Sequence, residues 1–136
     1  MAIKHELDCV APAPKVPCHN DLVIGNWVLS SKGRLYLVDW EYAGMNTAMW
    51  DVACLSLETA YDNEQDDALL TYYLARTPNE IDIKQFIAHK IFIDYLWTLW
   101  GLTRVPFDGQ FMRDYAQMRY IRLKENLAIT QKSALK

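Results

Sequence analysis

The stretch from Pro17 to Val52 constrains the fold of this 136-residue chain more than any other. It begins P-C-H-N-D-L-V-I-G-N, continues through two short apolar runs, and ends D-W-E-Y-A-G-M-N-T-A-M-W-D-V. The apolar runs, 27–30 and 34–38, flank Ser31-Lys32-Gly33, a turn composition that is typical of a β-hairpin. We therefore expect a hairpin that brings the polar residues before it close to those after it.

Three of these polar residues form a set suited to phosphate chemistry. In an antiparallel pairing centred on the turn, we expect Asn26 to lie across from Asp39, with Cα atoms roughly 5 Å apart. Both supply hard oxygen atoms, which magnesium prefers. Asp21 precedes Asn26 by a short loop in which Gly25 relaxes the backbone, so its carboxylate is expected to face the same point. Phosphoryl transfer needs one carboxylate to deprotonate the acceptor hydroxyl and oxygen ligands to hold magnesium against nucleotide phosphates.

The two motifs H-N-D-L-V-I-G-N and D-W-E-Y-A-G-M-N resemble the catalytic core of the choline kinase and aminoglycoside phosphotransferase superfamily, whose shared motif is HxDxxxxN followed by an Asp. The form found here is most similar to bacterial choline kinases. The resemblance implies that Asp21 is the catalytic base, that Asn26 and Asp39 hold Mg²⁺, and that His19 braces the loop. ATP is the implied phosphate donor. The alternative for both Asp21 and Asp39 is turn capping, a common role of aspartate.

Aromatic residues further along suggest the acceptor. Trp97 and Trp100 lie three positions apart in an apolar segment expected to be helical, so they share a face. Tyr42 follows the second motif's Asp, and Tyr115 begins the final amphipathic run. Aromatic rings around one point bind a quaternary ammonium, each contributing about 0.5 to 2 kcal/mol. Choline is such a ligand, and the resemblance implies the same pocket, with Glu58 as a carboxylate that helps neutralise the cation.

Each of these residues also has a purely structural interpretation. Trp97 and Trp100 on an apolar helix are often core residues. Glu58 fits the solvated face of an amphipathic helix, and Tyr42 fits a packing position at a strand end. Asp51, in W-D-V-A, is expected to cap the following helix or to brace the catalytic loop.

The remaining pattern predicts an α+β fold, mainly helical, with the short hairpin in its catalytic region. We expect one domain over 1–136, consisting of an extended, proline-rich lead-in at 1–17, the catalytic loop and hairpin at 18–40, and a helical part at 48–132. Within it, helices are predicted at 48–62, 64–76, 83–104 and 110–131, with breaks at 77–79 and 106–109. The third helix is apolar nearly all round and is expected to be central and buried. The resemblance implies the C-terminal lobe of the protein kinase-like fold.

Composition excludes several classes of partner. A formal net charge of −3 and the lack of any Lys/Arg cluster leave no footprint for nucleic acid or an anionic membrane. The most apolar stretch is interrupted by His89, Lys90 and Asp94, so no membrane segment is expected. Three cysteines without metal-binding spacing fit reduced thiols, and a cytoplasmic protein is expected.

The nucleotide-binding part of such a kinase has no counterpart in this sequence. None of its 5 glycines lies in a phosphate-cradling loop, and few residues precede the first motif. We therefore expect the N-terminal nucleotide lobe to be absent and catalysis by this chain alone to be weak or nil. The surface that would face that lobe is expected to be apolar, and it offers a route to a homodimer.

Two further functions stay open at this point. One is a phosphotransferase acting on ethanolamine, thiamine or an aminoglycoside, although an aminoglycoside site would need several carboxylates, whereas this pocket offers chiefly rings and Glu58. The other is a truncated, non-catalytic choline-binding module.

Overall fold

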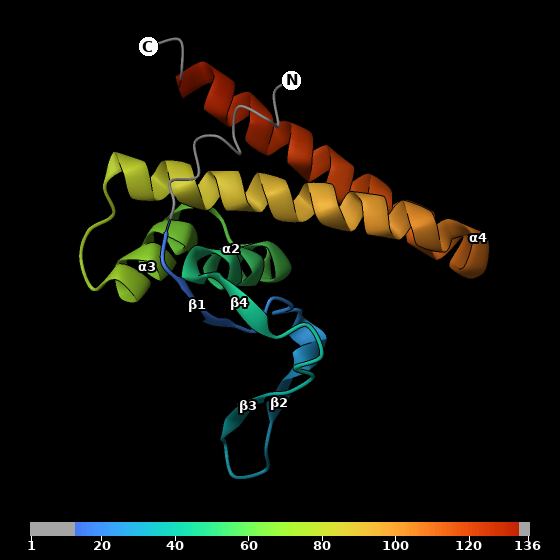
Figure 1. Ribbon diagram of the computed structural model, residues 1–136, viewed down its shortest axis with the longest axis horizontal. Helices are drawn as coiled ribbons and strands as arrows, with labels where there is room; N and C mark the ends of the chain where they lie inside the picture. The colour runs from blue at the N-terminus through green and yellow to red at the C-terminus, as the bar shows by residue number, and fades with distance from the viewer. Residues whose placement is uncertain (1–12, 134–136) are drawn as a thin grey trace. The chain divides into compact units, whose positions relative to one another are not determined.

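The computed structural model describes residues 13–133, which form two compact units, 13–86 and 87–133 (Figure 1). The first unit contains four short strands and two helices, and the second consists of most of the long helix α4. The architecture is mainly helical with small antiparallel sheets, as the sequence predicts. The expected single domain over 1–136 stays a prediction.

Two separate two-stranded antiparallel sheets make up the β-structure of the first unit. Strand β1 (Lys15–Cys18) pairs with β4 (Gly44–Thr47), and β2 (Trp27–Leu29) pairs with β3 (Leu35–Leu37). The second pair is the predicted hairpin, and Gly33 in its turn has a φ of 74°. The β1–β4 sheet was not predicted. It contains the last residues of the expected extended lead-in, of which residues 1–12 lie outside the described part.

Helices α2 (Ala48–Thr59) and α3 (Asn63–Leu74) follow β4 and agree closely with the predicted helical ranges. Ala60, in the left-handed conformation, ends α2. Asp62 then starts α3 with a reciprocal capping box to Gln65. The Ser56 hydroxyl hydrogen-bonds to Asp66 and so joins the two helices. These contacts fix where α2 ends and α3 begins, and they hold the two helices together in the first unit.

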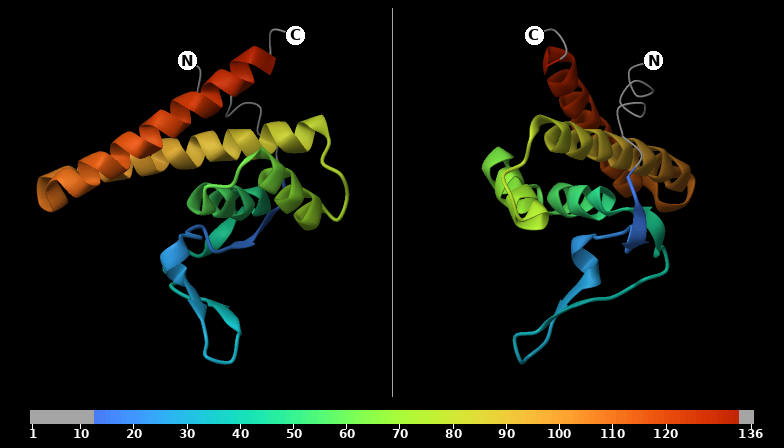
Figure 2. Two further views of the ribbon diagram at one scale, coloured as in Figure 1. Left: turned by 180° about the vertical axis from the view of Figure 1, so that it is seen from behind. Right: turned by 60° about the vertical axis from the view of Figure 1, so that its left-hand side comes forward.

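Helix α4 (Glu80–Ser133) comprises the two last predicted helices, interrupted only at Gly109. Gly109 has φ 63° and ψ −138°, a conformation that residues with a Cβ rarely adopt. Pro106 lies within the helical run and does not end it, so the break is narrower than the predicted 106–109. The residues before and after Gly109 form two arms, and in both figures these arms run alongside each other in opposite directions (Figures 1 and 2).

The expectation that the third predicted helix is central and buried agrees with the structure over residues 86–94 but not towards its end. Ile91 and Ile93 have exposed fractions of 1% and 0%, whereas Leu99 and Leu102 are 45% and 53% exposed. An apolar composition all round a helix therefore does not mean burial all round. The exposed leucines instead line a groove between the two arms of α4.

Candidate active site

His19 is buried and ties the catalytic loop to the end of the hairpin. The backbone N–H of Asp21 donates to its Nδ1 atom at 3.3 Å. Because Nδ1 accepts, the ring proton lies on Nε2, which donates to the Val38 carbonyl at 2.9 Å. The imidazole also meets the Trp40 ring edge-on, with centroids 4.7 Å apart. These contacts match the bracing role that the resemblance implies.

Asp51 braces the same loop from the first turn of α2. Its Oδ2 accepts the backbone N–H of His19 at 2.7 Å, and its Oδ1 accepts that of Asn20 at 2.8 Å. Thr47, not Asp51, is the N-cap residue of α2, so of the two predicted roles the structure supports bracing. The same carboxylate, after the larger effect of burial, raises the pKa of the Cys18 thiol above its ordinary value.

Asn20 is the residue that sequence reasoning missed in this loop. It adopts a left-handed conformation with φ 67°, which asparagine tolerates better than most residues. Its side-chain amide donates to the Tyr42 carbonyl at 2.9 Å, and its Oδ1 accepts from Asn46 at 2.8 Å. Trp50 Nε1 donates to its carbonyl at 3.2 Å. Its place between His19 and Asp21 was the available signal, because loops held in unusual conformations favour asparagine.

Asp21 and Asn26, the predicted base and metal ligand, are in direct contact. The 3₁₀ turn η1 (Ile24–Asn26) reverses the chain, and Asn26 Nδ2 donates to Asp21 at its carbonyl (2.9 Å) and its Oδ2 (3.2 Å). Because the amide nitrogen is used in this way, the amide oxygen of Asn26 is directed elsewhere and remains suited to a metal ion. The predicted closeness of these two residues is therefore present.

The pairing of Asn26 with Asp39 is wrong by one residue. The hairpin register pairs Trp27 with Leu37, so Asn26 lies opposite Val38, whose N–H donates to the Asn26 carbonyl at 2.9 Å. Asp39 follows immediately, with a φ of 61° that turns the backbone out of the strand. Among residues 13–133, no partner is seen for its exposed carboxylate. The carboxylate of Asp39 and the amide oxygen of Asn26 are both hard oxygen donors of the kind that Mg²⁺ prefers.

Two predicted acceptor residues also lie in the first unit. Tyr42 stands in the loop between β3 and β4 with its side chain 51% exposed, so it is not buried among packing residues. Glu58 lies near the end of α2 and is partly exposed. Tyr42 is linked to the catalytic loop through its carbonyl, as described for Asn20.

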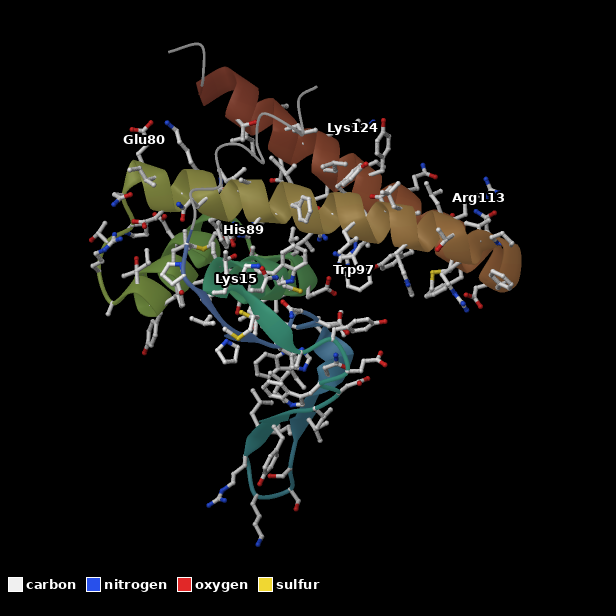
Figure 3. The ribbon with its side chains drawn as sticks, viewed as in Figure 1. Lys15, Glu80, His89, Trp97, Arg113 and Lys124 are labelled. Carbon is white, nitrogen blue, oxygen red and sulfur yellow. The ribbon has the colours of Figure 1, made fainter. Side chains whose placement is uncertain are left out.

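The other three predicted acceptor residues form a cluster in the second unit, here called the aromatic cluster (Trp97, Trp100 and Tyr115). The Trp97 and Trp100 rings meet edge to face with centroids 5.4 Å apart and an interplanar angle of 88°. Trp100 and Tyr115 meet at 6.0 Å and 77°. Figure 3 shows Trp97 on the arm of α4 before Gly109, whereas Tyr115 lies on the arm after it. The predicted shared face of Trp97 and Trp100 is therefore present, and Tyr115 joins it across the two arms.

A buried ion cluster beside these rings was not foreseen. Asp94, with an exposed fraction of 0%, accepts two bonds from Arg122, at 2.8 and 2.7 Å, and one from Arg119 at 3.3 Å. The Arg119 guanidinium also lies over the Tyr115 ring, 4.9 Å from its centroid. The sequence offered no signal for it, because the contact depends on which faces of the two arms meet beyond the turn at Gly109.

The class of protein to which the fold belongs is given by comparison with solved structures. Choline kinase LicA from Streptococcus pneumoniae superimposes on 93% of this chain and 45% of its own, with a TM-score of 0.78 and 32% sequence identity. The fold is thus that of the C-terminal lobe of a choline kinase-like protein. Protein LicA from Haemophilus influenzae is 36% identical over 110 residues, which is 76% of this chain. Human ethanolamine kinase 2 is 33% identical over 130 residues, covering 79% of this chain.

The family is given by a match to a family model. Residues 6–98 match the family described as Choline/ethanolamine kinase, and the chain belongs to that family. It spans 40% of the length of the H. influenzae protein and 33% of that of the human one. In the stretch 13–133, no helix combines the length and the hydrophobicity needed to cross a bilayer.

Proposed function

We propose that this chain carries the acceptor and magnesium lobe of an ATP- and Mg²⁺-dependent kinase that phosphorylates the hydroxyl of choline to give phosphocholine. The observation that carries the proposal is the contact between Asp21 and Asn26. It holds the carboxylate of the proposed base against a side-chain amide whose oxygen is suited to bind a metal ion. This contact lies in a loop braced by His19 and Asp51. Family membership supports the same reaction class.

In this proposal Asp21 accepts the proton of the choline hydroxyl as the oxygen attacks the terminal phosphorus of ATP, and the bond from that phosphorus to the bridging oxygen breaks to release ADP. Asn26 and Asp39 hold Mg²⁺, which when bound neutralises charge on the nucleotide phosphates. His19 takes no part in proton transfer, because both its ring nitrogens are used in bonds to the backbone. Its role is to hold Asp21 in place.

The acceptor is assigned from the aromatic residues. Trp97 and Trp100 offer ring faces and edges without an oxygen acceptor, and Tyr115 adds a third ring with a single hydroxyl, which suits a trimethylammonium group. Tyr42 and Glu58, which lie in the first unit, are proposed as further acceptor-binding residues, a ring and a carboxylate. Cys18 is a buried free thiol, which fits the proposed cytoplasmic location.

Ethanolamine is the second candidate acceptor, because human ethanolamine kinase 2 is among the similar proteins. Its primary ammonium carries three N–H donors that need oxygen acceptors when water is removed. The aromatic cluster supplies none from its ring faces. Choline is therefore the proposed acceptor, and the ratio of choline to ethanolamine binding decides between the two.

The test uses the 136-residue chain in two measurements. Choline and then ethanolamine are titrated while tryptophan fluorescence is recorded, with Trp97→Ala as the variant and Tyr95→Ala, on the same helix but outside the cluster, as its control. Phosphocholine formation from choline and Mg-ATP is followed by ³¹P NMR, with Asp21→Asn. We expect choline to quench more strongly than ethanolamine, and Asp21→Asn to abolish the weak turnover that the chain supports without a nucleotide lobe.

The outcomes separate the alternatives. Turnover that survives Asp21→Asn would remove the assignment of Asp21 as base. Saturable choline binding without any turnover would favour a choline-binding module over an enzyme. Stronger binding of ethanolamine than of choline would reverse the choice of acceptor.

A further inference from the structure

The ring of Tyr115 is restrained on several sides within the second unit. Trp100 meets it edge-on at 6.0 Å, and the Arg119 guanidinium lies over it at 4.9 Å from the centroid. On the first arm of α4, a Cβ added at Gly101 would lie 3.0 Å from Tyr115 Cδ1 and 3.0 Å from the Ala116 Cβ. The absence of a side chain at Gly101 therefore lets the two arms, and with them the ring, approach closely.

Arg119 is held in place by Asp94. Its exposed fraction is 3% and that of Asp94 is 0%, so neither charge is solvated and each needs a partner. The distance from Arg119 Nη1 to Asp94 Oδ1 is 3.3 Å. Two bonds from Arg122 fix the orientation of the carboxylate, and the Thr98 hydroxyl donates to the Asp94 backbone carbonyl at 2.6 Å. A guanidinium anchored in this way cannot leave the ring without breaking a buried ion pair.

Arg119 and Arg122 share the same carboxylate but differ in one respect. Both are on the second arm and both bond to Asp94, and in the stretch 13–133 it is Arg119 whose guanidinium lies over the Tyr115 ring. Loss of Arg119 leaves Asp94 with its two-bond partner Arg122, and loss of Arg122 leaves it with Arg119. The pair therefore separates the effect of losing an ion pair from the effect of losing the contact to the ring.

We propose that Asp94 and Arg119 are positioning residues for the acceptor site: Asp94 holds the Arg119 guanidinium against Tyr115, and this contact fixes the ring at the edge of Trp100. The inference rests on the proposed function in one respect, namely that the aromatic cluster binds the quaternary ammonium. It adds that one face of Tyr115 is already covered by a cation, so choline meets the cluster from the remaining side. The positive charge of Arg119 is offset by Asp94, so the ordering of the ring outweighs repulsion of the ligand.

The experiment compares Arg119→Met, Arg119→Lys and Arg122→Met in the 136-residue chain. Methionine keeps an unbranched apolar stem in place of the guanidinium, and lysine restores a cation over the ring. Two quantities are measured: near-UV circular dichroism without ligand, which reports the asymmetric packing of the Trp and Tyr rings, and the choline dissociation constant from tryptophan fluorescence. Far-UV circular dichroism confirms that each variant is folded.

We expect Arg119→Met to weaken the near-UV signal and to raise the choline dissociation constant about threefold to tenfold. Arg119→Lys is expected to recover part of both, and Arg122→Met, which keeps Arg119 over the ring but loses two bonds to Asp94, to change both clearly less than Arg119→Met does. Equal effects of Arg119→Met and Arg122→Met would overturn the inference, because the ion pair alone would then matter. An unchanged near-UV signal or an unchanged dissociation constant in Arg119→Met would overturn it as well.

The two readouts also separate this inference from the proposed function. If the unmodified chain does not bind choline, the acceptor assignment fails, and the near-UV comparison alone decides whether Arg119 positions the ring. If choline binds and Arg119→Met behaves like the unmodified chain, the proposed function stands and the positioning role falls.

Discussion

The side-chain amide of Asn26 donates to Asp21 twice, to its backbone carbonyl at 2.9 Å and to its carboxylate at 3.2 Å. One contact thus sets the direction of two functional groups. It holds the carboxylate of the proposed base and orients the amide so that its oxygen is directed away from Asp21. A metal ligand oriented by its own second hydrogen bond binds more tightly than one that is free to rotate.

The first prediction tests this coupling with Asn26→Ala, which removes both the oxygen ligand and the amide donor. We expect the affinity for Mn²⁺, used as a spectroscopic substitute for Mg²⁺, to fall about 10- to 100-fold. Electron paramagnetic resonance of free Mn²⁺ measures the affinity, with Mg²⁺ as competitor. Asn63→Ala, at an exposed position on α3, is the control. Unchanged Mn²⁺ affinity in Asn26→Ala would exclude this residue as a ligand.

The second prediction concerns the brace from Asp51 to the catalytic loop. Asp51→Asn keeps the shape of the side chain but turns one acceptor atom into a donor that faces a backbone N–H, at either His19 or Asn20. We expect the free energy of unfolding to fall by about 2 to 3 kcal/mol, measured by urea denaturation at neutral pH. The exposed Asp67, also replaced by Asn, is the matched control. Equal stability of the two variants would argue against the brace.

Local patterns in the sequence were sufficient to predict the hairpin, the helical ranges and the shared face of Trp97 and Trp100. The register of the hairpin was predicted wrongly by one residue. The turn is centred on Lys32, and this centre places Val38, not Asp39, opposite Asn26. The β1–β4 sheet was missed because its strands are four residues long, and one of them contains Pro17.

Contacts between distant parts of the sequence could not be predicted at all. The pairs of Asp94 with Arg119 and Arg122 join positions 25 and 28 residues apart. They depend on how tightly the two arms of α4 turn at Gly109 and on which faces then meet. The contribution of Asn20 likewise depends on a left-handed backbone conformation that no periodicity indicates.

The third prediction concerns pH and the start of α4. The side-chain bond from Arg76, together with the backbone N–H of Asn79, lowers the pKa of Asp82 below its ordinary value of 3.8. A lowered folded-state pKa means that the stabilisation is complete above the unfolded pKa and is lost as pH falls through the folded one. Urea denaturation of the chain and of Asp82→Asn should therefore show a constant stability difference from pH 7 to about pH 5 that shrinks below about pH 4. A difference independent of pH down to pH 2 would contradict the linkage.

The fourth prediction concerns the close approach of the two arms at Gly101. Alanine is favoured over glycine in a helix by about 1 kcal/mol, but its Cβ would press on Ala116 and the Tyr115 ring at 3.0 Å. Because these effects oppose each other, we expect Gly101→Ala to change the free energy of unfolding by less than about 1 kcal/mol while it displaces the ring. Near-UV circular dichroism should change clearly, whereas the urea midpoint should shift little. A large gain in stability with an unchanged near-UV signal would show that the arms are not tightly packed there.

The fifth prediction concerns self-association through the hairpin. Its apolar side chains are exposed on both faces of a two-stranded ribbon, with Leu29 68% and Leu35 59% exposed and directly opposite each other. Val28 and Tyr36, on the other face, are 46% and 49% exposed. An isolated two-stranded hairpin of this kind is marginally stable, and its apolar surface favours a partner.

We therefore expect the chain to form dimers through this hairpin at high protein concentration and the double variant Leu29→Thr, Leu35→Thr to remain monomeric. Threonine keeps the β-propensity of both strands, so the change removes apolar surface without favouring another backbone conformation. Sedimentation velocity over a range of concentrations measures the effect, with Ile81→Thr, at an exposed position on α4, as the control. A monodisperse monomer of the unmodified chain at every concentration would contradict this prediction. Dimers that persist in the double variant would place the interface on another surface.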